Sequence, residues 1–199
     1  MQISASLIKE LREKTGAGML DCKEALTNVD GNLEEAIAFL RKKGLADAKK
    51  RAGRMTSEGL IGSYIHTNSK IGVLVEVNSE TDFVARTDEF QDLVKNIAMH
   101  IAAANPRYLQ AEDIPAEDIE KEKEILLSQA RESGKPDNVL EKIVEGRLKK
   151  FVAENCLLDQ SYVKEPEITI NQLIQSAISK MGENIGIRRF IRFQLGEEL

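Results

Sequence analysis

Residues 60–77 read LIGSYIHTNSKIGVLVEV, and this stretch decides the fold. Two apolar runs rich in Ile, Val and Leu flank the polar residues 67–70, a pattern typical of two antiparallel strands joined by a short turn. Residues 187–195, near the far end of the chain, alternate arginine with apolar side chains and predict a third strand. We therefore expect a small three-stranded antiparallel sheet.

The segment before this hairpin has helical spacing instead. Residues 4–44 predict three short helices, and the first should stop near Gly16. Asn32 should cap the third helix, because its side chain can accept the backbone amide three residues further on, and Gly44 is placed to end it. The inward faces of these helices carry Leu7, Ile8, Leu11, Cys22, Ala25, Leu26, Leu33, Ala36, Ile37 and Leu40.

A small and basic segment follows the helices. Residues 45–58 hold four basic side chains among alanine and glycine, and we interpret them as a linker. Few contacts should cross such a segment. We therefore predict a helical head with its basic linker over residues 1–54 and an α+β core domain over residues 55–199.

Helices should also surround the sheet. A long helix is predicted from about Asp88 until Pro106 closes it, and a shorter one near residues 171–182. Residues 116–155 contain two highly charged helical stretches that flank Gly134-Lys135-Pro136, and their apolar positions are sparse. A thin apolar stripe on such a hairpin indicates a projecting arm. The predicted fold class is α+β: a three-helix bundle, a three-stranded sheet with flanking helices, and the arm.

Charge and composition restrict the function classes. The 199-residue chain has a net charge of −5, of which residues 1–54 contribute +3 and the remainder −8. An acidic body argues against a general nucleic-acid binder and favours protein partners. No apolar run approaches the ~20 residues of a membrane span, and the start lacks the features of a signal peptide. With Cys22 and Cys156 as the only cysteines, a disulfide framework is excluded, and we expect a cytoplasmic protein.

The motifs of catalysis are missing. Gly16-Ala17-Gly18 only weakly resembles a dinucleotide loop, since it follows a helix rather than a strand, and there is no phosphate-binding loop. His66 and His100 lie in different elements, and neither has a second ligand at metal spacing. We interpret Cys22 as a small core residue. We therefore expect no enzymatic activity, no cofactor and no metal site.

The connection between the hairpin and the long helix is the most informative segment. Residues 78–86 read NSETDFVAR and place Phe83 in a polar turn between acidic residues and Arg86. One interpretation is that Phe83 packs back into the core before the helix. The other is that it serves as an apolar wedge on a well-supported turn, which is a suitable anchor for binding another protein.

Motifs along the chain resemble the translation elongation factor Ts family. The first is Thr81-Asp82-Phe83-Val84-Ala85-Arg86, and the second is the head segment from Leu11 to Leu26. Further matches occur in the same order, at residues 66–78, 97–103, 133–136 and 145–151. Because together they cover nearly the whole chain, chance similarity is a poor explanation.

This resemblance implies a guanine-nucleotide exchange factor that binds elongation factor Tu in its GDP form, displaces magnesium and promotes GDP release, so that GTP can rebind. The head would be similar to ubiquitin-associated domains, and the arm to the coiled-coil module of the family. Thr81, Asp82, Phe83 and Val84 would dislodge the magnesium ion of the partner. The residues implied in partner binding are Arg12, Met19, Leu20, Lys23 and His100.

The chain resembles the short form of the family, with one sheet-forming repeat where longer members have two. A homodimer is therefore expected, through the sheet edge and the segment around Cys156-Leu157-Leu158. The alternative is a monomer whose sheet edge is covered by the helix at residues 171–182. Two other functions stay open at this point: recognition of ubiquitin-like or nascent-chain ligands by the head, and RNA binding through the basic residues 49–54.

Overall fold

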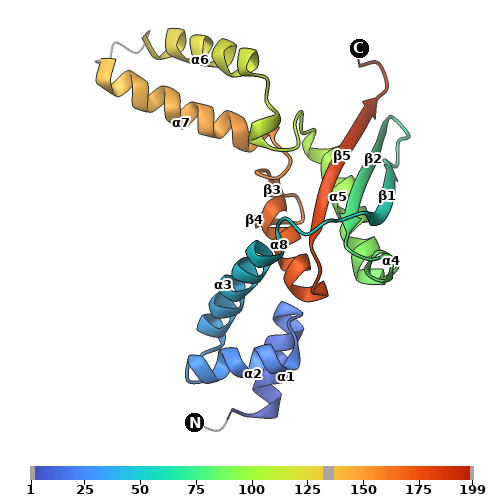
Figure 1. Ribbon diagram of the computed structural model, residues 1–199. Coiled ribbons are helices and arrows are strands. Elements are labelled where there is room, and N and C mark those ends of the chain that lie inside the picture. Colours follow the sequence, from blue (N-terminus) through green and yellow to red (C-terminus); the bar gives the residue numbers. More distant parts are fainter. Residues whose placement is uncertain (1–2, 132–136, 198–199) are drawn as a thin grey trace. The chain divides into compact units, whose positions relative to one another are not determined.

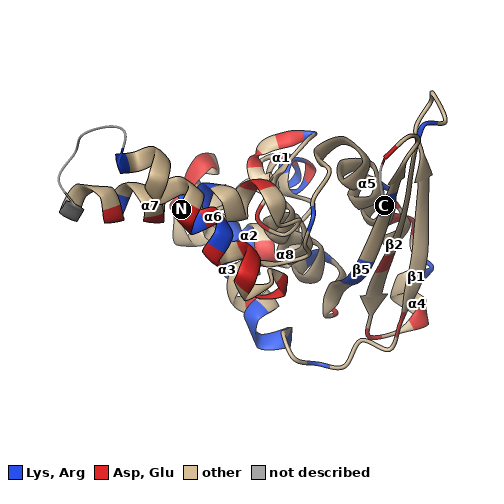
Figure 2. Ribbon diagram, turned by 90° about the horizontal axis from the view of Figure 1, so that it is seen from above, with Lys and Arg blue, Asp and Glu red and all other residues tan. Residues whose placement is uncertain are grey.

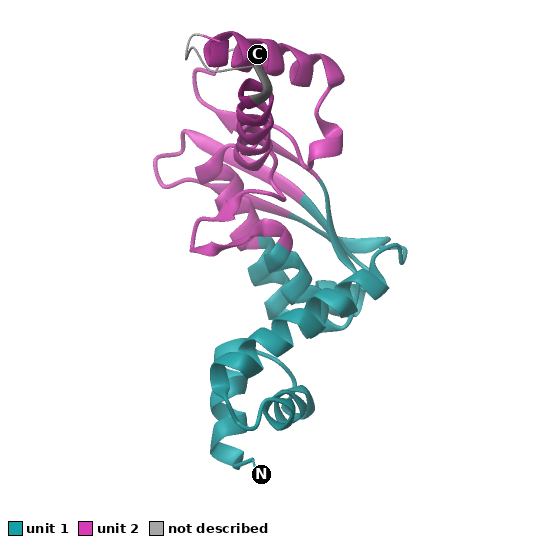
Figure 3. Ribbon diagram, turned by 90° about the vertical axis from the view of Figure 1, so that its left-hand side faces the viewer, with its two compact units in different colours: residues 1–61, 76–94, 172–188 teal, residues 62–75, 95–171, 189–199 magenta. Residues whose placement is uncertain are grey.

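The structure is a computed structural model that describes residues 3–131 and 137–197 (Figure 1). The predicted turn at Gly134-Lys135-Pro136 lies outside the described residues. The chain divides into two compact units (Figure 3). Unit 1 comprises Met1–Ile61, Glu76–Val94 and Gln172–Arg188, and unit 2 comprises Gly62–Val75, Lys95–Asn171 and Arg189–Leu199.

Unit 1 begins with three helices, as the sequence predicts: α1 (Ala5–Thr15), α2 (Met19–Asn28) and α3 (Leu33–Arg51). α1 ends at Gly16, whose φ of 68° is the left-handed conformation that glycine adopts without steric cost. The Asn32 side chain accepts the backbone amides of Glu34 and Glu35 and so caps α3, as expected. The bundle encloses a small core of Leu11, Cys22, Ala25, Leu26 and Ala36, which confirms Cys22 as a core residue.

The end of α3 differs from the prediction. The helix continues through Gly44 to Arg51, so the linker interpretation is wrong for residues 45–51. The physical reason is a close approach within unit 1. A Cβ atom on Gly44 would lie 3.3 Å from the Ser179 side chain of α8 (Ile170–Met181), and Gly44 is buried. Gly44 therefore allows two helices to pack closely, and it does not end the first one.

The three-stranded antiparallel sheet is confirmed, with the order β1-β2-β5. Its strands are β1 (Glu58–Ile65), β2 (Ile71–Ser79) and β5 (Ile185–Gln194). Alternate residues of β2 are buried, with Val73, Val75 and Val77 at most 2% exposed. Between β2 and β5 in the sequence come the single-turn helix α4 (Asp82–Ala85) and the long helix α5 (Asp88–Ala104), which begins where the sequence predicts.

Unit 2 contains the predicted helical arm. A 3-10 turn at Ala111–Asp113 leads into α6 (Ala116–Arg131), which packs on α7 (Asp137–Asn155). Their shared core is narrow and consists of Leu126, Ala130, Leu140 and Val144. Figure 2 shows acidic and basic residues along both helices, and ion pairs such as Lys149–Glu145 at 3.1 Å join successive turns. A thin core with a charged exterior explains why the sequence signal for an arm was clear.

Two short strands were not predicted. β3 (Ser161–Tyr162) and β4 (Glu165–Thr169) form a separate antiparallel pair before α8. The segment expected to mediate dimerisation also differs from the prediction, because Cys156 and Leu157 are fully buried. Leu157 and Leu158 donate backbone hydrogen bonds to the carbonyl oxygens of Tyr108 and Leu109. Residues 156–157 therefore offer no surface for a second copy. Among the described residues, the helices are too short or too polar to cross a membrane.

Candidate partner-binding site

The connection at residues 79–86, here called the motif turn, presents an exposed aromatic side chain. Thr81 caps α4, and its hydroxyl oxygen accepts the amide of Val84 at 3.4 Å. Phe83 is 79% exposed, whereas Ala85 of the same turn is 6% exposed. The interpretation in which Phe83 packs into the core is therefore wrong. The short helix is anchored by its alanine and holds its phenylalanine in solvent.

Two carboxylates and a buried serine hold the motif turn in place within unit 1. The Glu183 carboxylate accepts hydrogen bonds from the Thr81 amide at 3.0 Å and from the Thr81 hydroxyl at 2.6 Å. The Glu80 carboxylate accepts the backbone amide of Asn184 at 2.6 Å. The Ser79 hydroxyl is fully buried and donates to the Thr81 carbonyl oxygen at 2.9 Å. Hydrogen bonds to ionised acceptors are short and strong, so the backbone of this turn is well fixed.

The charged residues of the motif turn lie nearer to solvent. Asp82 and Arg86 form an ion pair of 2.7 Å across one turn of helix, with Arg86 77% exposed and Asp82 44% exposed. Such exposed pairs contribute about 0.3–0.5 kcal/mol. Val84 is half-buried beside them. The turn thus offers one large apolar side chain with a negative and a positive group next to it.

The head carries a second exposed apolar surface, also in unit 1. Met19 and Leu20 begin α2 and are 59% and 83% exposed. Arg12 on α1 and Lys23 on α2 are exposed as well, so all four head residues named by the resemblance lie on the surface. We call this set the head surface. This set combines two apolar side chains with two cations, a composition that suits contact with an acidic protein surface that also carries apolar residues.

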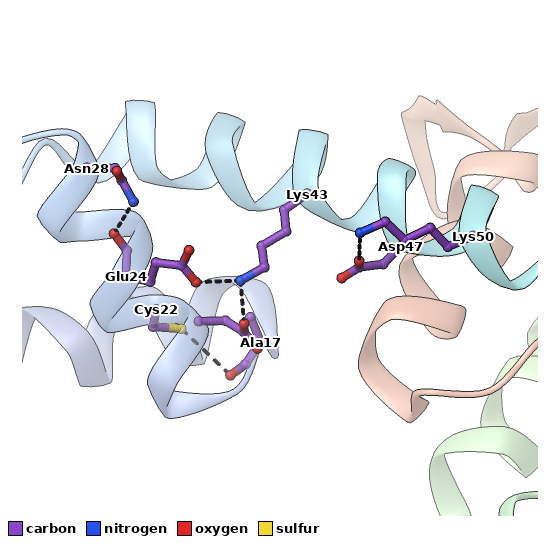
Figure 4. A network of polar contacts seen from close by, with 8 residues as sticks. Ala17, Cys22, Glu24, Asn28, Lys43, Asp47 and Lys50 are labelled. Atoms are coloured by element: carbon purple, nitrogen blue, oxygen red, sulfur yellow. Dashed lines mark hydrogen bonds and ion pairs between the residues drawn. The ribbon is translucent and has the colours of Figure 1, made fainter.

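Lys43 of α3 forms two ion pairs with α2, the helix that carries Met19, Leu20 and Lys23 of the head surface (Figure 4). Its ammonium lies 2.8 Å from Asp21 Oδ1 and 2.5 Å from Glu24 Oε2, and these hydrogen bonds, that to Asp21 first, raise the pKa of Lys43. On the other side of α2, the Cys22 thiol points toward the Ala17 carbonyl oxygen at 3.7 Å. Burial raises the pKa of the Cys22 thiol, which makes it a poor nucleophile.

His100 lies inside unit 2 and not on its surface. Its Nδ1 accepts the amide of Val163 at 3.3 Å, so Nε2 carries the proton and donates to Gln160 Oε1 at 3.0 Å. Gln160 in turn donates to the Glu154 carbonyl oxygen at 2.7 Å. His100 is 0% exposed, and burial lowers its pKa. A partner contact at His100 stays a prediction, and in this structure the imidazole ties α5 to the chain after α7.

The structure therefore brings Thr81–Val84 together in one braced turn, places the head surface in the same unit, and leaves His100 in the other unit. Sequence reasoning missed the residues that support these surfaces, namely Ser79, Glu183, Asn184 and Lys43. Glu183 is 102 residues from Thr81, so no local pattern could have identified it. Within residues 3–131 and 137–197, no group of three or more His, Cys, Asp or Glu side chains is arranged to hold a metal ion.

Comparison with known proteins gives consistent matches. The family model described as elongation factor TS matches residues 4–197. The chain is 59% identical over 199 residues to elongation factor Ts of Geobacter sulfurreducens, covering 100% of this chain and 92% of that protein. It is 60% identical over 195 residues to the Thermoanaerobacter sp. strain X514 protein of the same name, with coverages of 98% and 96%. It is 59% identical over 197 residues to elongation factor Ts of Fervidobacterium nodosum, covering 99% of this chain and 100% of that protein.

Proposed function

The chain belongs to the elongation factor Ts family, and from this premise we propose how its two exposed surfaces act on the partner. The family function is nucleotide exchange on the GTPase elongation factor Tu during translation elongation, which takes place in the cytoplasm. The chain is therefore an exchange factor and not an enzyme. Thr81, Asp82, Phe83 and Val84 form the part that loosens magnesium and GDP, and the head surface supplies a second contact.

Exchange needs no contact with the nucleotide itself. GDP is held through its phosphates and through the partner's magnesium ion, which neutralises them, so loss of the ion weakens the remaining contacts. The factor must bind the empty or magnesium-free GTPase better than the loaded one. By linkage, the factor then weakens GDP binding to the same extent that GDP weakens binding of the factor.

The motif turn supplies the wedge, and the observation that supports it is the exposure of Phe83 on a braced turn. At 79% exposure, Phe83 keeps most of its surface available for burial against a partner. Complete burial of a phenylalanine stabilises a complex by about 1.5–3 kcal/mol. Because the turn is already ordered, little of this free energy is lost in fixing its conformation. Asp82 and Val84 enter the partner beside Phe83.

One wedge is not sufficient on this estimate. A ~10⁴-fold shift between two states of the partner requires about 5.5 kcal/mol of differential binding. The head surface must supply the remainder, through Arg12, Met19, Leu20 and Lys23. We therefore propose that residues 1–54 form one contact with elongation factor Tu and that residues 55–199 form the other. The predicted domain boundary near residue 54 separates the two.

A second copy of the chain is a further proposed partner. In the strand order β1-β2-β5, two strands lie at sheet edges, and exposed edges favour pairing. Apolar side chains also remain exposed on the sheet, among them Ile65, Leu74 and Phe193. Light scattering at micromolar concentration in reductant tests this proposal, because a mass near the 22.2 kDa of one chain would exclude a free dimer.

The proposed wedge is tested by the release of fluorescently labelled GDP from elongation factor Tu. The intact protein should accelerate release strongly, and Phe83→Ala should remove about 1.5–3 kcal/mol of this effect, or roughly ten- to a hundredfold in rate. Ile125→Ala is the control, since Ile125 is a 51% exposed apolar side chain on α6. Equal rates for Phe83→Ala and the intact protein would contradict the wedge. A loss of about 3–5 kcal/mol in unfolding free energy would instead indicate a core role for Phe83.

A further inference from the structure

The connection between α8 and β5 lies against the motif turn. This connection comprises residues 182–184, and it begins at Gly182, whose φ is 77°. Glu183 accepts two hydrogen bonds from Thr81, and Asn184 donates one to Glu80. The two segments thus exchange hydrogen bonds in both directions, from positions 102 and 104 residues apart in the sequence. All of these residues belong to unit 1.

Glu183 determines the orientation of the Thr81 side chain. The Thr81 hydroxyl donates to Glu183 Oε1 at 2.6 Å and accepts the amide of Val84 at 3.4 Å. A hydroxyl has only one proton, so donation to Glu183 leaves its lone pairs free for the helix cap. Glu183 Oε2 also accepts the Thr81 backbone amide at 3.0 Å. The first turn of α4, which carries Phe83, is therefore fixed at both the backbone and the side chain of its cap.

We infer that Glu183 is a positioning residue for nucleotide exchange, which acts through Thr81 to hold Phe83 in the orientation that enters the partner. This inference rests on the proposed role of Phe83. Without the carboxylate, Thr81 loses its two bonds to Glu183, and α4 has only one turn with which to keep its direction. Phe83 then stays exposed but samples several orientations. The partner then binds only the fraction of molecules in which Phe83 has the productive orientation. This lowers the acceleration of GDP release.

The inference predicts a particular change in kinetics. In a titration of the GDP-release rate against factor concentration, Glu183→Ala should lower the maximal rate about five- to tenfold. The half-saturating concentration should change little, because the head surface is intact. Glu183→Gln keeps one acceptor oxygen and should recover part of the rate. Glu167→Ala, which removes an exposed carboxylate in unit 2, is the control and should leave the rate unchanged.

A double-mutant cycle separates positioning from general stabilisation. If Glu183 acts through Phe83, Glu183→Ala should have almost no further effect in a Phe83→Ala background. Multiplicative effects of the two substitutions would overturn the inference, as would a maximal rate unaltered by Glu183→Ala. A normal rate for Phe83→Ala alone would instead contradict the proposed wedge itself. Thermal melting confirms that each variant is folded, and if Glu183→Ala melts below the assay temperature, Glu183→Gln takes its place in the same cycle.

Discussion

The head surface and the motif turn present similar side chains on differently supported helices. Met19 and Leu20 on α2 and Phe83 on α4 are all more than half exposed in the first turn of a helix. α2 forms ion pairs with Lys43 of α3 through Asp21 and Glu24, whose side chains are about half exposed. The motif turn is held by half-buried hydrogen bonds from the distant residues 183–184.

The difference in support indicates a difference in role. Exposed ion pairs contribute about 0–1 kcal/mol and weaken in salt, so α2 is held mainly by its packing in the head. Hydrogen bonds to charged groups contribute about 1.5–3 kcal/mol each, so the motif turn has a fixed geometry. A contact that supplies affinity tolerates some adjustment, whereas a wedge that displaces part of the partner does not. We therefore expect the head surface to contribute to both binding and GDP release, and the motif turn to act mainly on the rate of GDP release.

The largest effect is expected when both surfaces are removed. Combining Met19→Ala and Leu20→Ala with Phe83→Ala should remove about 3–6 kcal/mol of differential binding and abolish most of the acceleration of GDP release. The effects should be additive, because the core cluster of the head includes no residue of the motif turn. If Phe83→Ala alone reduces release to the rate without factor, the two-contact model is wrong.

The head surface alone should have a smaller and different effect. Met19→Ala with Leu20→Ala should cost about 1.5–3 kcal/mol of affinity and raise the half-saturating concentration roughly tenfold or more. The maximal rate of GDP release should also fall, because the head surface supplies part of the differential binding. A fall in the maximal rate with unaltered half-saturation would assign the rate-controlling role to the head and reverse the comparison.

The pH dependence of the unfolding free energy tests whether the His100 imidazole is buried in the core or exposed like the head surface and the motif turn. Burial lowers the pKa of His100 from its ordinary value of 6.5. The His100 imidazole therefore takes up a second proton more readily in the unfolded chain than in the folded one. The contribution of His100 to stability is complete above about pH 6.5 and is lost as the pH falls toward its pKa in the folded protein. His100→Gln should reduce this dependence in urea unfolding at pH 7.5 and 5.5. An unchanged pH dependence in this variant would indicate that His100 is accessible.

The smallest effect is expected at Lys43. Lys43→Ala should change the half-saturating concentration by at most about fivefold, equivalent to 0–1 kcal/mol, and the effect should shrink at high salt. The control is Lys149→Ala, which breaks the exposed ion pair with Glu145 on α7. A large and salt-independent loss for Lys43→Ala would indicate that α2 depends on this residue as strongly as the motif turn depends on its braces.

Much of the fold could be predicted because its signals are local. The hairpin, the third strand, the arm and the helix from Asp88 follow from periodicity and from turn residues. The same signals failed at Gly44, where a glycine that could end a helix instead lies against Ser179. They also missed β3 and β4, whose two to five residues are too short to establish a period. The role of Gly44 and the pairing of these short strands depend on their neighbours in space, which the local sequence does not specify.

The candidate site also has features that the sequence could predict and features that it could not. The sequence by itself determined the types of the main elements, and motifs in order along the chain identified the family. It named Thr81–Val84 and the head residues as candidates, but it left the direction of Phe83 open between core and solvent. Only the tertiary structure decided that Phe83 faces solvent and that Glu183 holds its turn. The physical reason is that side-chain burial and long-range hydrogen bonds depend on which distant segments meet in space, and a contact across 102 residues leaves no periodic signal in either segment.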